Sequence, residues 1–386
     1  MNKYVNSGFI FFFILNLLYS ALAKALTINT GDIFQATLLP QTSIPNYYKT
    51  YAVNNVKQVY QALNTIKNDQ GYSAIIFNEG VYHLKHTLNI TSPNLMFLSK
   101  SADPSNTILR GNGMKPTKGV DNLLYIAAPN FIIDGLTLEQ AGNHLIQIAG
   151  EKGARKPIIR NAILQDSYEQ LIKVTYSKKH RDKFSNEGVI ENNLFRYTKG
   201  VGPNYYIGGI DAHGIRNWVI QNNIFENIAS PSKYMAEHAI HLWNDTFNNV
   251  VKNNLIINSD RGIGFGMRMQ NPNYIYHSNF GGVIEDNIIY HENNNNKFSD
   301  VGVILEGSPN TMIENNIIFL EHNYPNAIEY RFEQSTNIVI KNNTTNKDIQ
   351  QRNGAQASVK KNNVIKLRDV DIIKAINKFK ELNFIK

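Results

Sequence analysis

An acid and an imidazole stand two residues apart in the segment Gly208-Gly209-Ile210-Asp211-Ala212-His213. Side chains of a β-strand alternate between two faces, so Asp211 and His213 are expected to leave such a strand on the same side. A carboxylate beside an imidazole can orient the ring and raise its basicity, which suits a general base that takes a proton from a substrate. Outward strand positions are also polar in any soluble protein, so the surrounding elements must decide between the two interpretations.

Six other segments share the design of this strand: a small residue or Leu, then an aliphatic residue, then three more. Their second and fourth positions are mostly apolar and are predicted to face a core, so the third and fifth positions face outward. The third positions are Gln147, Lys173, Asp211, His241, Gly264, Ile304 and Glu329, and the fifth positions are Ala149, Thr175, His213, Trp243, Gly266, Glu306 and Arg331.

This outward face has the composition of a sugar-binding surface. Gly264 and Gly266 are predicted to leave a notch without side chains, bordered by Trp, His, Glu and Arg. An indole stacks on a sugar ring, and charged groups bind hydroxyls and carboxylates. The alternative is an ordinary polar surface, on which Glu329 and Arg331 form an ion pair worth little energy.

A paired asparagine recurs along the chain and indicates the fold. Copies such as Val219-Ile220-Gln221-Asn222-Asn223-Ile224-Phe225 place the first Asn or Asp at residues 134, 161, 192, 222, 253, 286, 315, 342 and 362. Self-similarity at a period near 30 residues is typical of a solenoid, and β-branched segments broken by Asn, Gly and Asp indicate β coils. Stacked coils bring the second Asn of each pair onto its counterpart, where side-chain amides can form a hydrogen-bonded ladder.

With this pattern the chain resembles the right-handed parallel β-helix proteins of the pectate-lyase-like superfamily over roughly residues 51–365. The resemblance implies an all-β, single-stranded solenoid. An amphipathic helix is expected at residues 53–66, followed by strands that end in Gly80-Val81-Tyr82, and a second helix carries the apolar stripe of Ile372, Ile373, Ile376, Phe379 and Leu382. Both helices are expected to cover the open strand edges at the two ends of the solenoid. The predicted organisation is a signal peptide at 1–23, a β-helix domain at 24–368 and a C-terminal capping helix at 369–386.

Asp211-Ala212-His213 also resembles, locally, the Asp-Pro-His segment of mannuronan C5-epimerases, and Glu237-His238-Ala239-Ile240 resembles a following strand of that family. The resemblance implies abstraction of the C5 proton of a uronic acid, with His213 as the base and Asp211 as its partner. Re-protonation on the other face gives an epimerase, and loss of the 4-O substituent gives a lyase. This sequence has Ala212 in place of Pro, and Trp243-Asn244 where the family has an arginine that neutralises the substrate carboxylate.

Proton abstraction next to a carboxylate needs that negative charge to be neutralised, so a cation within reach is expected. Arg261, Arg268 and Lys173 are the candidates for this role. The predicted catalytic residues are His213, Asp211, His241 and Arg261. The predicted substrate-binding residues are Lys173, His238, Trp243, Arg268, Glu306, Glu329 and Arg331.

Three alternatives stay open. A glycoside hydrolase needs two facing carboxylates, and Asp211 and Glu306 lie three coils apart, about 14 Å at the usual strand spacing. No cofactor is predicted, although His213, His238, His241 and Asp211 could converge on a divalent cation without any compact metal motif. A carbohydrate-binding or adhesion protein would use the same face for recognition only.

The N-terminus has the composition of a secretory signal peptide. Lys3 precedes the apolar run from Phe9 to Leu18, which is too short to span a bilayer, and Ala21-Leu22-Ala23 predicts cleavage after Ala23. We therefore expect an exported protein, periplasmic or secreted, and a monomer; an uncleaved anchor is the alternative. The chain has no cysteine, which excludes disulfides and thiolate metal sites.

The net charge is +8 for the full sequence. A basic exported protein suits an acidic polysaccharide or oligosaccharide as partner, although the excess charge could serve solubility alone. No basic cluster with interleaved aromatic residues is present, so a nucleic-acid partner is not expected.

Overall fold

Asparagine, the residue that repeats along the sequence, sits at a turn of every central coil in the computed structural model. The structure describes residues 28–68, 71–116, 120–268, 277–292, 298–365 and 369–384. The first residue of the central pairs, as at Asn192, Asn222 and Asn253, has a positive φ between 50° and 58°. Asn tolerates this left-handed conformation better than most residues do, which explains its use at this bend. The expected signal peptide at 1–23 lies outside the described residues.

The second Asn of each pair forms the predicted ladder. Asn223 Nδ2 donates to Asn254 Oδ1 at 3.0 Å, and Asn254 Nδ2 donates to Asn287 Oδ1 at 3.0 Å. The same oxygens also accept a hydrogen bond from the backbone N–H of the asparagine in the preceding coil. Each buried side-chain amide therefore fixes the turn of that coil. The ladder continues through Asn193, Asn316, Asn343 and Asn362.

The register differs from the sequence prediction in the first and the last copy. Gly135, and not Asp134, has the positive φ of the first copy, and Lys361 has it in the last, which leaves Asn362 in the ladder position. Glycine reaches this conformation without strain. The repeat is therefore shifted by one residue at both ends.

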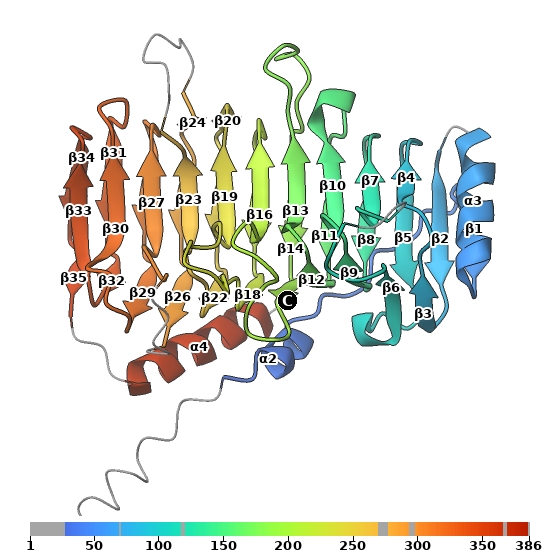
Figure 1. Ribbon diagram of the computed structural model, residues 1–386, viewed down its shortest axis with the longest axis horizontal. Helices are drawn as coiled ribbons and strands as arrows, with labels where there is room; N and C mark the ends of the chain where they lie inside the picture. Colours follow the sequence, from blue (N-terminus) through green and yellow to red (C-terminus); the bar gives the residue numbers. More distant parts are fainter. Residues whose placement is uncertain are drawn as a thin grey trace, which may run out of the picture.

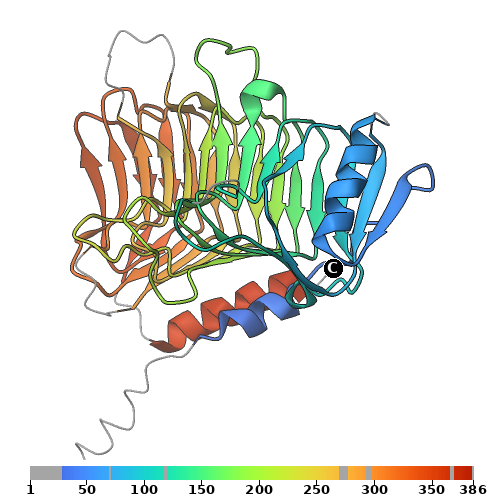
Figure 2. The same cartoon turned by 45° about the vertical axis from the view of Figure 1, so that its right-hand side comes forward.

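Three long parallel sheets form the walls of the solenoid, and each coil contributes one strand to each sheet (Figures 1 and 2). Within the described residues, the 12-stranded sheet holds β1 (Lys49–Val53), β2 (Ser73–Phe77), β5 (Leu95–Ser99), β8 (Ile132–Asp134), β11 (Ile158–Arg160), β14 (Val189–Glu191), β17 (Val219–Gln221), β21 (Val250–Lys252), β25 (Val283–Glu285), β28 (Met312–Glu314), β31 (Ile338–Lys341) and β34 (Ala357–Lys360).

The other two sheets have the same parallel order. In the described part of the chain, the 10-stranded sheet holds β4 (Leu88–Ile90), β7 (Leu124–Ile126), β10 (Ile146–Ala149), β13 (Gln170–Thr175), β16 (Gly208–His213), β19 (Ile240–Trp243), β23 (Ile263–Gly266), β27 (Val303–Glu306), β30 (Asn326–Arg331) and β33 (Asp348–Arg352). The 11-stranded sheet, counted over the same ranges, holds β3 (Gly80–His83), β6 (Thr107–Arg110), β9 (Thr137–Ala141), β12 (Ile163–Ser167), β15 (Leu194–Arg196), β18 (Ile224–Glu226), β22 (Leu255–Ile257), β26 (Ile288–His291), β29 (Ile317–Leu320), β32 (Thr344–Thr345) and β35 (Asn363–Val364). Two short strands, β20 (Thr246–Phe247) and β24 (Asn279–Phe280), pair separately.

The N-terminal end of the solenoid is covered as predicted. Helix α3 (Val56–Asn68) packs against β1 and β2 at the edge of the 12-stranded sheet, and Val59 and Ile66 join the interior core. Aromatic rings continue this core along the axis, with the ring centroids of Phe77 and Phe97 5.2 Å apart. The predicted all-β solenoid with an N-terminal capping helix is confirmed.

The C-terminal helix is present, but its predicted position over the last coil is wrong. Helix α4 (Asp369–Phe384) lies along the outer side of the 11-stranded sheet, next to α2 (Thr30–Ala36) (Figure 1). Its apolar stripe packs on a row of outward aliphatic and aromatic side chains. These side chains are Ile163, Leu194, Ile224, Leu255, Ile257, Ile288, Tyr290 and Phe319. An apolar outer sheet face attracts the helix more strongly than the narrow edge of one coil does.

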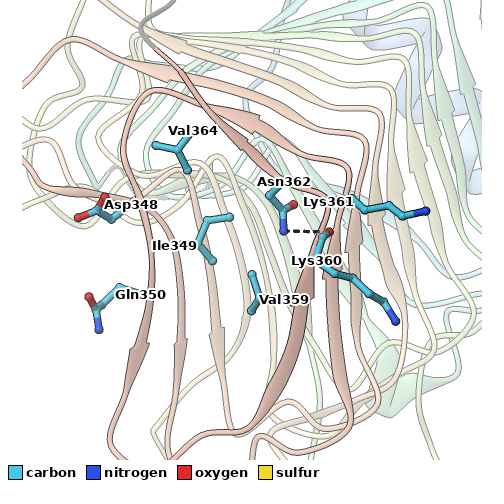
Figure 3. Close-up of a pocket in the computed structure, with 8 residues that line it drawn as sticks. All are labelled: Asp348, Ile349, Gln350, Val359, Lys360, Lys361, Asn362 and Val364. Atoms are coloured by element: carbon cyan, nitrogen blue, oxygen red, sulfur yellow. Dashed lines mark hydrogen bonds between the residues drawn. The ribbon is translucent and has the colours of Figure 1, made fainter.

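The last coil ends in a hollow lined by side chains of β33, β34 and β35. Figure 3 shows Ile349, Val359, Asn362 and Val364 on this end, among the residues that line it. Val359 is 44% exposed and Val364 is 54% exposed, so no described residue seals the apolar interior at this edge. None of the described helices is long and apolar enough to cross a membrane.

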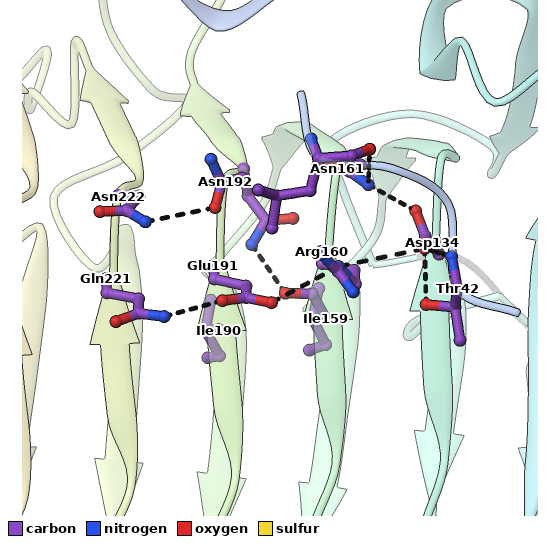
Figure 4. A network of polar contacts seen from close by, with 12 residues as sticks. Thr42, Asp134, Ile159, Arg160, Asn161, Ile190, Glu191, Asn192, Gln221 and Asn222 are labelled. Atoms are coloured by element: carbon purple, nitrogen blue, oxygen red, sulfur yellow. Dashed lines mark hydrogen bonds and ion pairs between the residues drawn. The ribbon is translucent and has the colours of Figure 1, made fainter. Parts of the chain in front are cut away.

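An N-terminal strap, residues 28–47, crosses several coils before the solenoid begins. Figure 4 shows Thr42 at Asp134, where its N–H and its hydroxyl both donate to Oδ2 at 2.7 Å, close to Asn161 and Asn192. Leu39 exchanges two hydrogen bonds with the Asn161 side chain, and Asn192 Nδ2 donates to the Thr37 carbonyl at 2.7 Å. The outer asparagines therefore anchor the strap, a role that the sequence pattern did not indicate.

The ladder leads to a stability prediction. Asn254→Ala removes an oxygen that accepts two hydrogen bonds and a buried N–H donor, so it should lower the free energy of unfolding by about 2 kcal/mol or more. Asn253→Gly keeps the positive φ and loses one partly buried side-chain hydrogen bond, to Asn222. It should change the free energy of unfolding by less than about 1 kcal/mol. Urea unfolding of both variants checks this, and equal losses would contradict a special role for the ladder.

Helix α4 gives a second prediction. Phe379→Ala should lower the free energy of unfolding by about 3 kcal/mol, because the ring is 1% exposed and packs on the sheet. Ile373→Ala, a matched change on the same helix at a side chain 40% exposed, should cost less than about 0.5 kcal/mol. Thermal unfolding measures the difference, and a neutral Phe379→Ala would show that the helix does not dock.

Candidate functional site

The 10-stranded sheet aligns the predicted outward columns in register. Lys173 pairs with Asp211, and Asp211 pairs with His241. His213 lies opposite Trp243, and His241 lies opposite Gly264. The alternation that the sequence predicted therefore brings side chains from β13, β16, β19 and β23 onto one surface.

Asp211 is the hub of this surface. Lys173 Nζ donates a hydrogen bond to Oδ2, and Trp243 Nε1 donates to Oδ1 at 2.7 Å. Burial acts to raise the pKa of Asp211, but the neighbouring His213 and the charge of Lys173 outweigh it and hold that pKa well below its ordinary value. Asp211 thus stays a carboxylate and fixes the positions of its neighbours.

His213 is the imidazole of the site that solvent reaches. Its side chain is 16% exposed, with Nε2 3.5 Å from Asp211 Oδ1 and 3.1 Å from Lys173 Nζ. Asn244 Nδ2 lies 3.4 Å from Nδ1 on the other side of the ring. The ring also meets Trp243 edge-to-face at a centroid distance of 4.2 Å. His213 is therefore a positioned imidazole with a cation directly beside it.

Lys173 is the cation that lies nearest to His213 among the three predicted candidates with described contacts. Arg261 Nε lies 3.5 Å from Asp300 Oδ2, and its Nη2 lies 3.8 Å from Met235 Sδ. The Arg268 guanidinium lies 6.0 Å from the Phe332 ring centroid. Arg261, predicted as catalytic, and Arg268, predicted as substrate-binding, thus have contacts elsewhere on the sheet.

The predicted notch at Gly264 is filled. The ring of His238 lies over this glycine so closely that a Cβ there would meet Nε2 at 2.8 Å. A Cβ at Gly266 would meet the Glu306 carbonyl at 1.9 Å, so this glycine also serves packing. The glycines make room for a neighbouring side chain and for a close backbone approach, and not for a sugar.

His238 and His241 are buried, at 6% and 5% exposure. His241 stacks nearly parallel to Trp243, with ring centroids 5.4 Å apart. Burial lowers the pKa of both imidazoles, so both are neutral at pH 7. Because both rings are buried, a large substrate has no direct route to either of them in this arrangement. This argues against the predicted catalytic role of His241 and the predicted substrate contact of His238.

The far end of the predicted surface consists of ion pairs between coils. Arg331 Nη1 lies 2.8 Å from Glu306 Oε1, and Arg352 Nη1 lies 3.0 Å from Glu329 Oε2. The expected surface pair of Glu329 with Arg331 is therefore wrong, because each Glu pairs with an Arg of the next strand. Glu329 is 1% exposed and also accepts from Tyr324 and Asn326, so it is structural.

Exposed tyrosines in the loops that precede β16 and β19 were missed by the sequence analysis. Tyr205, Tyr206 and Tyr234 are 48%, 45% and 55% exposed, and the rings of Tyr205 and Tyr234 lie 5.1 Å apart. Burial, together with the charges of Asp211, Glu169 and Glu237, raises the pKa of Tyr206. The adjacent tyrosines Tyr205 and Tyr206, in the loop before β16, were the feature of the sequence that could have indicated this aromatic surface.

Solved structures share this architecture, although no protein-family model and no curated protein matches the chain. The surface adhesin PfbA of Streptococcus pneumoniae is 15% identical, with a TM-score of 0.57 over 82% of this chain and 90% of the adhesin. A mannuronic-acid-specific polysaccharide family 6 lyase from human gut microbiota is 14% identical, with a TM-score of 0.53 over 81% and 79%. The catalytic unit of a GH87 α-1,3-glucanase from Streptomyces thermodiastaticus is 10% identical, with a TM-score of 0.52 over 86% and 71%. Similarity at this level shows the parallel β-helix fold alone.

The buried imidazoles predict a loss of stability in mild acid. Burial lowers the pKa of His144, which lies just before β10, from 6.5 to about 4. The unfolded chain then binds more protons between these values, so stability is full above pH 6.5 and declines as the pH falls towards 4. At pH 5 this residue alone should cost about 2 kcal/mol relative to pH 7.

Urea unfolding at pH 7 and pH 5 measures the effect. His144→Gln should show a smaller drop between the two pH values than the unchanged protein, while His83→Gln, at an exposed position, should show the same drop. A His144→Gln variant with an undiminished drop would assign the acid sensitivity to other groups.

Proposed function

We propose that this protein is an exported carbohydrate-active β-helix protein that binds a uronic-acid-containing polysaccharide on the surface of β13, β16 and β19. The reaction is abstraction of the C5 proton by His213, which leads to a lyase or a C5-epimerase. The observation that carries the proposal is the solvent-reached imidazole of His213 with the Lys173 ammonium 3.1 Å from Nε2. Export rests on the expected signal peptide, and the predicted periplasmic or secreted location and the monomeric state belong to the same proposal.

In the proposed reaction Lys173, His213 and Asp211 each have one role. A substrate carboxylate takes Lys173 as its partner, which releases His213 Nε2 to accept the C5 proton. The electron pair left at C5 is delocalised into the carboxylate, whose charge the ammonium balances. Expulsion of the 4-O substituent, whose oxygen takes a proton from water, then gives a C4–C5 double bond. Return of a proton from water to the opposite face gives the epimer instead. Asp211 holds Lys173 and Trp243 in place and does not touch the substrate.

Substrate binding falls to the exposed aromatic loops in this proposal. Tyr205 and Tyr234 offer ring faces to neighbouring sugars, and Lys233 lies 5.3 Å from the Tyr234 ring centroid and supplies positive charge for an acidic polymer. Trp243 contributes less than predicted, because its indole packs against His213 and His241 and donates to Asp211. These tyrosines would equally serve a protein that binds polysaccharide without changing it, which is the second candidate function.

Three variants separate catalysis from binding. His213→Gln should lower turnover by roughly 10²–10⁴-fold and leave affinity nearly unchanged, because it removes the base and little surface. Tyr234→Ala should weaken binding, with turnover of bound polymer retained. His83→Gln, an exposed histidine on the 11-stranded sheet, is the matched control and should change neither.

Deuterium incorporation at C5 in D₂O reports proton abstraction for lyase and epimerase alike, and an unsaturated product identifies the lyase. Alginate, pectate and glycosaminoglycans are the substrates to compare. Binding without exchange or product in the unchanged protein would establish the recognition-only function. A fully active His213→Gln would remove His213 as the base.

A further inference from the structure

We propose that Glu237, His238 and His241 form a binding site for one divalent transition-metal ion, with Zn²⁺ as the ion that fits best. Each of the three residues offers one ligand atom, and these atoms all lie within 4.8 Å of one another. Two imidazoles and a carboxylate from one short segment form a set typical of zinc sites that keep a further position for water. The inference does not depend on the reaction proposed above.

His238 carries the strongest evidence. Both of its ring nitrogens are buried, and neither has a hydrogen-bond partner among the residues that the structure describes. Buried polar groups are nearly always paired, so an imidazole with two unpaired nitrogens needs a partner from outside the chain. The ring is also held firmly, because it occupies the space above Gly264 where any Cβ would collide with it.

His241 has the geometry of a metal ligand supported from behind. Its Nε2 lies 3.0 Å from the Gly266 carbonyl and donates to it, which leaves the lone pair on Nδ1. Histidine ligands commonly donate their second N–H to a backbone carbonyl in this way, because the bond fixes the tautomer and the ring orientation. The lone pair of Nδ1 thus lies on the side of Glu237, whose Oε2 is 3.8 Å away.

The separation between Nδ1 of His241 and Oε2 of Glu237 is too long for a hydrogen bond and close to what a shared ion requires. Ligand distances of about 2.0 Å to a tetrahedral zinc ion place two ligand atoms roughly 3.3 Å apart. A small rotation of the Glu237 side chain, which is 31% exposed, covers the difference. The same exposure gives the ion a path to two otherwise buried rings.

Charge around the site is compatible with a cation. Arg261 opposes a cation near His238, but Asp300 lies 3.5 Å from its Nε, and Asp211 favours positive charge beside His241. Calcium and magnesium prefer oxygen ligands, so the two imidazoles select a transition metal.

A second pair of neighbouring histidines shows the contrast. The rings of His291 and His322 lie 4.9 Å apart. Both nitrogens of His291 have partners, however, with the Glu292 carbonyl and the Ser299 hydroxyl each at 2.8 Å. In His322, Nδ1 accepts from the Tyr324 N–H and only Nε2 is buried without a partner, whereas both nitrogens of His238 are. Proximity of two imidazoles alone therefore does not mark a metal site, and the two unpaired nitrogens of His238 distinguish this cluster.

Titration of the full chain, first stripped with a chelator, with ZnCl₂ tests the proposal. One equivalent should bind, and Glu237→Gln and His241→Gln should each weaken binding at least about tenfold, because each removes one ligand atom. His144→Gln is the matched control, a buried histidine just before β10 and outside the cluster, and should bind as the unchanged protein does. Circular dichroism confirms the fold, and Glu237→Gln, isosteric and partly exposed, keeps the test valid if His241→Gln unfolds.

Co²⁺ in place of zinc adds a spectroscopic readout. The unchanged protein and His144→Gln should give visible absorption typical of a four-coordinate site with nitrogen and oxygen ligands, and Glu237→Gln should lose or shift it. Absence of stoichiometric binding would overturn the proposal. Zinc that binds equally to all variants would assign the metal to exposed histidines elsewhere and would overturn it as well.

Discussion

The hydrogen bond from one buried asparagine amide to the next is the interaction on which the rest of the structure depends. Each side chain from Asn193 to Asn362 along the ladder fixes one turn and, through it, the start of the next strand. The spacing of the strands is set by the backbone, but their register comes from this turn. A shift of one residue in a single coil would turn Asp211 into the core and Ala212 outward. The positions of the site residues therefore depend on the register that the asparagine ladder sets.

A second constraint acts on the outside. After the pairs that begin at residues 192, 222, 253, 286 and 315, the next residue, as in Leu194, Ile224 and Leu255, is apolar, and so is the residue that follows it. One of the two faces the core and the other faces outward, so the 11-stranded sheet is apolar on both sides and needs a cover. Helices α2 and α4 supply that cover. The sequence predicted the amphipathic helix at the C-terminus, but this row of outward aliphatic residues, which gives its true position, was not used.

Much of the fold and part of the site could be predicted, because strand alternation and the repeat are properties of the local sequence. They placed Asp211, His213, His241 and Trp243 on one face correctly. Contacts between coils could not be predicted in the same way: Arg331 and Arg352 each reach an acid one strand back, and His238 turns over Gly264 from a bend upstream of β19. The strap at residues 28–47 has too little periodicity to be recognised, since its hydrogen bonds are made with coils more than 90 residues away, as at Thr42 and Asp134.

The strap changes how the solenoid behaves as a mechanical object. In a simple repeat array each coil contacts only its neighbours, so the ends can fray one coil at a time. Here Thr30 is bonded to Glu226, 196 residues away, and α2 contacts α4, so segments from both ends of the described chain meet on the middle coils. A force that separates those ends therefore acts first on the two helices and the strap, and only then on the strands. The strap is synthesised before the coils near Leu194 and Ile224 on which α2 packs, so it can dock only after those coils have formed.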